Sequence, residues 1–135
     1  MGLTPTRIYI DSCVVIYLVE EHRDFAPIVE SLLEKAPDAK LFISDLTVME
    51  SLVGPFRSGN KALEAKFNGW FAGITVLSLT NEIFVDAARL RAANASLKTP
   101  DSLHLATATH YSCDEFWTND GRLDKVAPTI VRNIL

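Results

Sequence analysis

Four acidic residues could do chemistry together in this sequence, although they are spread over most of its length. They are Asp11, Glu50, Asp101 and Asp120. Carboxylates that lie close together cannot all stay ionised, because each negative charge raises the pKa of its neighbours. A divalent cation removes this conflict, and a ligand set made only of oxygen atoms suits Mg²⁺ or Mn²⁺. Because such ions bind phosphate oxygens and activate water, the four acids predict phosphoryl chemistry.

Each acid also has a simpler explanation when it is considered alone. Asp11 can cap a helix, and Asp101 can interact favourably with a helix dipole, which contributes roughly 0.3–1 kcal/mol. Asp120 precedes Gly121 and fits a turn equally well. Glu50 fits a solvated helix face less well, because apolar residues flank it on both sides. The metal hypothesis therefore requires all four acids to meet in one place.

Short apolar runs alternate with amphipathic segments along the chain, and these two patterns predict strands and helices. The predicted strands are 7–10, 40–44, 74–79, 115–118 and 129–132. The predicted helices are 14–21, 25–36, 45–54, 61–73, 82–95 and one that starts at Thr99. Strands that alternate with helices indicate an α/β protein. We expect a three-layer α/β/α fold with a central, mainly parallel sheet.

Local signals mark where three of these helices begin or end. Gly54 and Pro55 predict the end of the third helix and a loop after it. Asn81 is expected to cap the fifth helix. Thr99 and Pro100 predict a capped start for the last helix, with proline at its first helical position. That helix is apolar around most of its circumference, so we expect it to be largely buried.

The fold class itself predicts where the four acids lie. Parallel sheets covered by helices bind ligands beyond the carboxyl ends of their strands. Asp11 and Asp120 each directly follow a predicted strand, and Asp101 lies in the first turn of a helix that opens at the same edge. Glu50 lies about one and a half turns into its helix, where its longer side chain can reach back. We therefore expect the four acids to converge on one crevice.

Composition narrows the class of protein. The 135 residues, 48% of them hydrophobic and 22% charged, suit one globular domain over 1–135. The net charge of −4 argues against a protein that coats nucleic acid by bulk electrostatic attraction. Cys13 and Cys113 provide neither a disulfide framework nor a metal-binding spacing. No apolar run reaches the roughly 18–20 residues of a membrane span and no secretory signal is visible, so we expect a cytoplasmic protein.

Four stretches, taken together and in order, resemble the PIN-domain family, in particular the VapC-type toxins of bacterial toxin–antitoxin systems. They are "YIDSCVVIYLVE", "SDLTVMESLVGPFRSGN", "LKTPDSLHLATA" and "FWTNDGRL". The resemblance implies a metal-dependent endoribonuclease, a hydrolase that cleaves RNA phosphodiester bonds with Mg²⁺ or Mn²⁺. It also implies the catalytic and metal-binding residues, which would be Asp11, Glu50, Asp101 and Asp120.

The resemblance extends to the surroundings of the acids and to partners. Small polar residues at Ser12, Thr118 and Asn119 would orient the acids. Cys13 departs from the family, in which this position usually carries Asn or another polar residue. The implied partners are an RNA substrate, a second copy of the chain in a homodimer, and a small antitoxin that inserts a basic residue into the acidic site.

Three further residues are candidates for a role. His104 follows Asp101 by three residues and could act as a proton shuttle. We favour a buried histidine that is hydrogen-bonded to the backbone, because metal-activated water needs no histidine base. Arg57 and Lys61 lie in the expected loop "GPFRSGNK" and are the candidates for contact with RNA or a partner.

Other acid-using α/β classes fit the sequence less well. A haloacid-dehalogenase-like phosphatase needs a second Asp two residues after its nucleophile, and Cys13 stands there. A response-regulator receiver needs paired acids near its first strand and a late lysine, and a nucleotide-binding ATPase needs a glycine-rich phosphate loop. Two alternatives stay open: a PIN-domain RNA-processing nuclease that is not a toxin, and a non-catalytic PIN module that binds RNA or protein.

Overall fold

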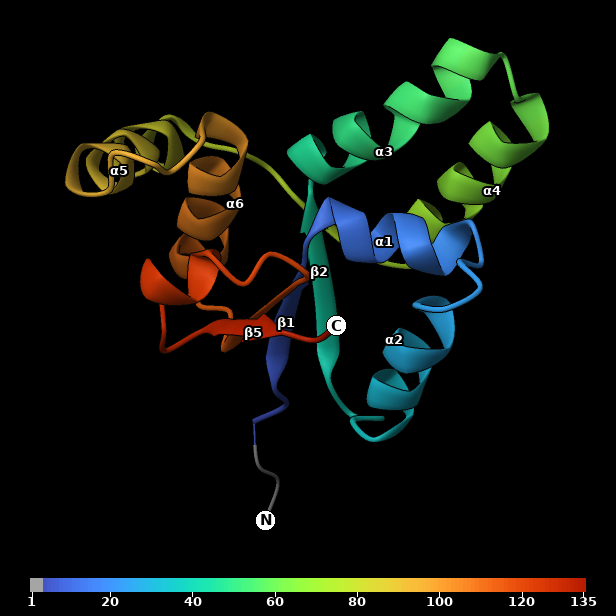
Figure 1. Cartoon of the computed structure of the whole chain (residues 1–135), viewed down its shortest axis with the longest axis horizontal. Helices are drawn as coiled ribbons and strands as arrows, with labels where there is room; N and C mark the ends of the chain where they lie inside the picture. The colour runs from blue at the N-terminus through green and yellow to red at the C-terminus, as the bar shows by residue number, and fades with distance from the viewer. Residues whose placement is uncertain (1–3) are drawn as a thin grey trace.

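The computed structural model describes residues 4–135, which contain a sheet of five strands (Figure 1). The strands are β1 (Arg7–Ile10), β2 (Lys40–Ser44), β3 (Thr75–Leu77), β4 (Glu115–Thr118) and β5 (Val131–Asn133). All neighbouring pairs are parallel, and the order across the sheet is β3-β2-β1-β4-β5. The predicted parallel sheet is therefore confirmed, and β1 lies at its centre.

Six α-helices and a short 3-10 helix connect these strands. They are α1 (Ser12–Val19), α2 (Ala26–Glu34), α3 (Asp45–Ser58), α4 (Lys61–Ala72), α5 (Asn81–Ala93), α6 (Thr99–His110) and η1 (Leu123–Lys125). In Figure 1, α5 and α6 lie on one side of the sheet, and α1, α2 and α4 lie on the other. This arrangement confirms the three-layer α/β/α fold. Within residues 4–135, no helix is both long and apolar enough to span a membrane.

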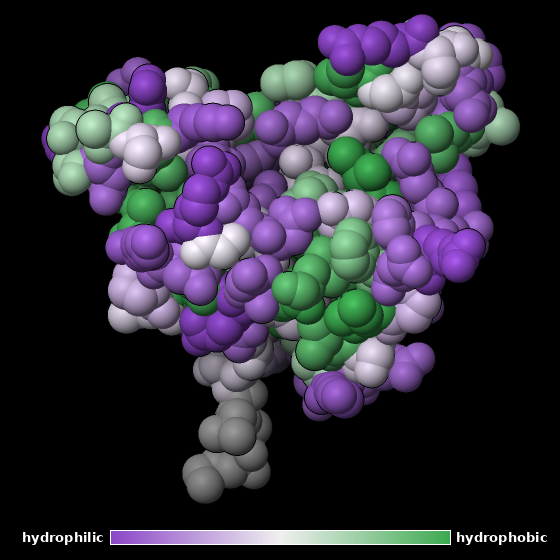
Figure 2. Space-filling model, viewed as in Figure 1, coloured by the Kyte–Doolittle hydropathy of each residue, from purple (hydrophilic) through white to green (hydrophobic). Residues whose placement is uncertain are grey.

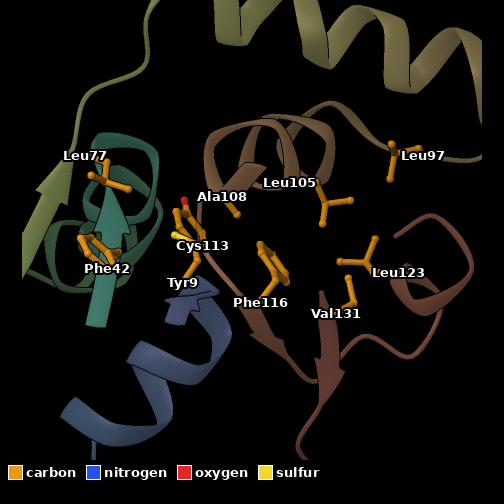
Figure 3. Packing of buried hydrophobic residues seen from close by; sticks show 10 residues of the cluster. All are labelled: Tyr9, Phe42, Leu77, Leu97, Leu105, Ala108, Cys113, Phe116, Leu123 and Val131. Atoms are coloured by element: carbon orange, nitrogen blue, oxygen red, sulfur yellow. The ribbon is translucent and has the colours of Figure 1, made fainter. Parts of the chain in front are cut away.

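The two faces of the sheet carry separate apolar clusters, because side chains alternate along a strand. Tyr9, Phe42 and Phe116 point to the face that α6 covers, where Leu105 and Ala108 meet them (Figure 3). The opposite face presents a second set of strand residues to α1, α2 and α4. Its strand residues are Ile8, Ile10, Ile43 and Trp117, and its helix residues are Val14, Val15, Val19, Val29 and Phe67.

Helix α6 is buried as expected, but its start differs from the prediction. Every residue from Ser102 to Ala108 is buried. The N-cap is Lys98 and makes no side-chain capping bond, so Thr99 is already the first helical residue. The Thr99 hydroxyl instead accepts a hydrogen bond from Nη1 of Arg91 at 2.9 Å. The prediction that Thr99 caps the helix was wrong because the first helical hydrogen bond already goes to the carbonyl of Lys98, which accepts the N–H of Ser102 at 3.0 Å.

Helix α3 is longer than predicted and removes the expected loop. It continues through Pro55 and ends at Ser58, and Gly59 caps it in the left-handed conformation with a φ of 66°. An interior proline costs about 3 kcal/mol, because it lacks an N–H group and its ring crowds the preceding turn. Burial offsets this cost, since Thr47, Ser51 and Pro55 form one buried stripe along the helix. Packing thus outweighs the local stop signal.

The start of α5 gives a smaller correction. Its N-cap is Thr80, whose hydroxyl accepts a hydrogen bond from the N–H of Ile83 at 3.4 Å. Asn81, the predicted cap, is the first helical residue. The apolar face of α5 packs on α6, because Ile83 and Ala87 are buried in a cluster that also contains residues of α6.

Candidate active site at the carboxyl edge of the sheet

Asp11 occupies the centre of this edge, between the end of β1 and the start of α1. Its own N–H donates to the carbonyl of Trp117 at 2.9 Å, which ties it to the neighbouring β4. Its Oδ1 accepts the N–H of Ser12 at 2.8 Å, and its Oδ2 accepts the hydroxyl of Thr118 at 2.8 Å. The side chain is thus an N-cap, as the simpler explanation held, and its carboxylate is also held from the adjacent strand.

Thr118 connects Asp11 to Asp120. Its hydroxyl donates to Asp11 and accepts the backbone N–H of Asp120 at 3.0 Å. Both carboxylate oxygens of Asp120 are bonded to the guanidinium of Arg122, at 2.9 Å from Nε to Oδ1 and 2.7 Å from Nη2 to Oδ2. These hydrogen bonds hold the pKa of Asp120 below its ordinary value.

Asp101 is half-buried in the first turn of α6, and its electrostatics differ from those of Asp120. Burial raises the pKa of Asp101 above its ordinary value, and the charges of Asp11 and Asp120 raise it further. Asp101 and Asp120 also line a shared cavity of about 60 Å³, beside Arg122. The structure therefore brings Asp101 within electrostatic reach of both acids that follow the strands.

Glu50 reaches the site from α3 through His104. Its Oε1 lies 2.5 Å from Nε2 of His104, and the same nitrogen lies 3.9 Å from Oδ1 of Asp11. The imidazole is buried, with an exposed fraction of 1%. Its other nitrogen, Nδ1, is bonded to the hydroxyl of Tyr9 at 2.6 Å. The prediction of a buried histidine is confirmed, but its partners are two side chains and not the backbone.

The four acids do not form a closed ligand shell. Thr118 links Asp11 to Asp120, and Glu50 approaches Asp11 through His104. In the described part of the chain, no three His, Cys, Asp or Glu side chains are close enough to hold one metal ion. The donor set nevertheless fits Mg²⁺ or Mn²⁺ chemically, because it consists of carboxylate oxygens. Burial, and after it the charges of Asp11 and Asp120, raise the pKa of Asp101, so carboxylates are concentrated at this edge. That concentration of negative charge is what a divalent cation would neutralise.

The three small polar residues named beside the acids contact them to different extents. Thr118 binds Asp11 through its hydroxyl, whereas Ser12 binds it through its backbone N–H. Asn119 points elsewhere, and its Nδ2 donates to the hydroxyl of Tyr17 at 2.7 Å. Cys13 is half-buried, and burial followed by the charge of Asp11 raises the pKa of its thiol to about 12. The thiol is therefore un-ionised beside the site.

Arg57 and Lys61 lie away from the acids. Arg57 is in the last turn of α3, seven residues after Glu50, a distance of about 10 Å along the helix axis. Lys61 starts α4, and its Nζ lies 3.5 Å from Oε1 of Glu64. Both residues are exposed and lie on helices, so the loop in which they were expected is absent there.

Two residues at this edge were not recognised from sequence as parts of it. Tyr9 reads as an apolar strand residue two positions before Asp11, and its hydroxyl contacts become visible only in the fold. Arg122 was one of several basic residues, and its spacing of two residues from Asp120 was the available signal for an ion pair. For Tyr9 the sequence offers no comparable local signal.

The structure thus defines a three-layer α/β/α protein with a parallel sheet and with acids at the carboxyl edge of that sheet. The chain belongs to the PIN-domain family, because its residues 8–128 match the PIN domain. No curated protein sequence matches the chain.

Solved structures of toxin–antitoxin proteins are similar in fold. VapBC2 from Rickettsia felis, bound to a promoter DNA fragment, has a TM-score of 0.77 and 16% identity over 94% of this chain and 98% of that one. A toxin–antitoxin complex from Klebsiella pneumoniae has a TM-score of 0.76 and 24% identity over 93% and 97%. VapC20 from Mycobacterium tuberculosis, a sarcin-ricin loop cleaving toxin, has a TM-score of 0.75 and 11% identity over 89% and 95%. At these identities the likeness establishes the fold alone.

Proposed function

We propose that this protein is a metal-dependent endoribonuclease and that its active site is the acidic edge of the sheet. The catalytic and metal-binding residues are Asp11, Glu50, Asp101 and Asp120. The observation that carries the proposal is the set of contacts between the acids at this edge. Thr118 links Asp11 to Asp120, His104 lies between Glu50 and Asp11, and Asp101 lines a cavity with Asp120. In agreement with this arrangement, burial and then the charges of Asp11 and Asp120 raise the pKa of Asp101. A protein without a use for this charge would gain stability by replacing a partly buried, repelled carboxylate.

In the proposed mechanism, the protein's own residues hold and orient the acids. Thr118 aligns Asp11 with the backbone of Asp120, and His104 holds one oxygen of Glu50. When bound, Mg²⁺ or Mn²⁺ supplies activation of water and stabilisation of charge on the phosphoryl and leaving 3′-oxygens. Arg122 must release Asp120 before both oxygens of that carboxylate are free, and its guanidinium then becomes available to a phosphate of the RNA.

The toxin of a toxin–antitoxin pair is the biological role we assign to this nuclease. Support comes from the similar structures, two of which are toxin–antitoxin assemblies and one of which is a toxin.

Figure 2 shows an apolar patch over α1, α2 and the C-terminal end of the chain, and a protein partner could cover this patch. A groove of about 370 Å³, lined by residues that include Leu32, Trp117 and Ile134, lies among these elements. A cytoplasmic location belongs to the same proposal.

A homodimer completes the proposed assembly. Met49, Val53 and Phe56 lie on one face of α3 and are 55%, 38% and 61% exposed. Apolar residues spaced by four and three positions form a stripe that a second copy of the helix could cover. Light scattering should give the mass of a dimer at high protein concentration, and a monomer mass throughout would contradict this part of the proposal.

A non-catalytic RNA-binding module is the second candidate, and one observation favours it. Arg122 binds both oxygens of Asp120, and the acids of the described chain are not gathered into a three-residue metal shell. Such a module would bind RNA without cleaving it. An RNA-processing nuclease that is not a toxin would share the chemistry and differ only in its substrate.

Cleavage of a labelled panel of structured RNAs tests the proposed activity. The reactions contain Mn²⁺, Mn²⁺ with excess EDTA, or Mn²⁺ with the Asp101→Asn protein. The Asn side chain keeps the shape of Asp and removes the charge, so we expect cleavage to fall at least a hundredfold. Asp86→Asn, which alters a half-buried acid on α5, is the matched control and should cleave normally. Cleavage that survives in Asp101→Asn would contradict this site, and binding without cleavage would favour the second candidate.

A further inference from the structure

A buried chain of hydrogen bonds ends on Glu50. The hydroxyl of Ser44 lies 2.8 Å from the hydroxyl of Tyr9, which lies 2.6 Å from Nδ1 of His104. Nε2 of His104 then lies 2.5 Å from Oε1 of Glu50. The four residues come from β2, β1, α6 and α3, and all except Glu50 are buried. Four separate elements therefore meet in one buried chain of polar side chains.

The chemistry of the groups determines which of them donates to Glu50. An ionised carboxylate only accepts hydrogen bonds, so Nε2 of His104 carries the hydrogen that Glu50 receives. With a neutral imidazole, Nδ1 is an acceptor and takes the hydrogen of the Tyr9 hydroxyl. Burial raises the pKa of Tyr9 well above its ordinary value, so the phenol keeps its hydrogen. The Tyr9 oxygen can still accept from Ser44.

The ring of Tyr9 is itself held in place. It stacks on Phe116 with a centroid distance of 5.3 Å and an angle of 8° between the rings. Both residues belong to the apolar cluster under α6 (Figure 3). The Tyr9 hydroxyl therefore has little freedom to move, and it orients the imidazole of His104 from the side opposite Glu50.

We propose that His104 is a positioning residue for Glu50 and that its Nε2–H, oriented by Tyr9, holds one carboxylate oxygen and leaves the other free for a divalent cation. This inference rests on the proposed function, because it concerns the same acidic edge. The position of Nε2 supports it, since this nitrogen also lies 3.9 Å from Oδ1 of Asp11. His104 thus keeps the acid contributed by α3 next to the acid at the centre of the sheet. Partners of this kind typically change metal affinity 10–100-fold.

Two substitutions of His104 separate this role from simple filling of the core. The amide nitrogen of Gln can occupy the place of Nε2 and donate to Glu50, whereas that of Asn reaches only the place of Nδ1. Isothermal titration with Mn²⁺, in the absence of RNA, gives the affinity of each protein. We expect His104→Asn to weaken Mn²⁺ binding about tenfold and His104→Gln to restore it to within about threefold of the wild type.

The outcomes distinguish this inference from the proposed function. Wild-type protein that binds no Mn²⁺ would overturn both. Wild-type binding with unchanged affinity in His104→Asn, or with equal losses in the Asn and Gln variants, would overturn the positioning role alone. Circular dichroism checks that each variant folds.

If His104→Asn does not fold, Tyr9→Phe replaces it, because it removes only the hydroxyl that orients the imidazole. We expect that variant to weaken Mn²⁺ binding about threefold, and an unchanged affinity would overturn the inference.

Discussion

The acidic edge has two ends, one at Glu50 and one at Asp120, and a different kind of partner holds the carboxylate at each end. Glu50 is bonded to His104, a buried residue 54 positions away in the sequence. Asp120 is bonded to Arg122, an exposed residue two positions away, whose side chain is 72% exposed. The first pair exists because four elements pack together, whereas the second is a local contact in solvent. We therefore expect the fold to maintain the Glu50 end and the Asp120 end to open more easily.

The largest expected difference between the two ends is in how much the loss of each partner lowers the free energy of unfolding. His104→Ala leaves a cavity in the core and removes the partner of Glu50, so we expect a loss of about 2–4 kcal/mol in the free energy of unfolding. Arg122→Ala removes an exposed ion pair and should leave that free energy nearly unchanged. Urea denaturation of the two variants measures both values. Equal losses would show that the two ends do not differ in this way.

Metal affinity should show that the Asp120 end opens. Arg122→Gln removes the group that competes for the Asp120 carboxylate, so we expect Mn²⁺ to bind about two- to fivefold more tightly. Arg89→Gln is a matched control, because Arg89 is also exposed and pairs with Asp86 at 2.7 Å, away from the site. Its affinity should equal that of the wild type. An unchanged affinity in Arg122→Gln would mean that this ion pair does not restrict metal binding.

For Asp101 we expect a smaller effect, on the pH dependence of the protein's stability, and its sign distinguishes a metal-site acid from a helix-capping acid. Its pKa is raised in the folded protein, so the folded state binds this proton more readily than the unfolded state. The contribution to stability is therefore present at low pH and is lost as the pH rises from the ordinary pKa through the raised one. Asp101→Asn removes this loss, and we expect the Tm of the metal-free protein at neutral pH to rise by about 2 °C.

A control variant sharpens the test of Asp101. Asp45 also lies in the first turn of a helix, but it is exposed and belongs to α3. Asp45→Asn should slightly lower the Tm, because it removes only a favourable interaction with the helix dipole. If Asp101→Asn behaves like Asp45→Asn, then Asp101 serves the helix alone. The pair of variants therefore decides between the two explanations of this residue.

Much of the fold could be predicted because its signals are local. The β-branched and aromatic runs predicted the strands, and the alternation of strands and helices predicted the parallel sheet and the edge where the acids lie. Local signals failed where packing opposed them. Gly54 and Pro55 should have ended α3, but burial of Thr47, Ser51 and Pro55 on one stripe carries the helix to Ser58.

The partners within the site were harder to predict than the acids. The bond between Tyr9 and His104 joins residues 95 positions apart, and no local pattern distinguishes that tyrosine from other core aromatics. His104 could be predicted as buried because it lies on an apolar helix, but its side-chain partners depend on how α3 and α6 pack against β1. Such contacts follow from tertiary structure, which periodicity does not encode.

The most direct test of the central claim is a crystal structure of the protein with Mn²⁺, in which anomalous diffraction locates the metal. We predict a manganese peak at the carboxyl edge of the sheet, within coordination distance of carboxylates that include Asp11, and with the guanidinium of Arg122 withdrawn from Asp120. No peak at this edge, with Arg122 still bonded to Asp120 at saturating Mn²⁺, would contradict the assignment of a metal-dependent active site here.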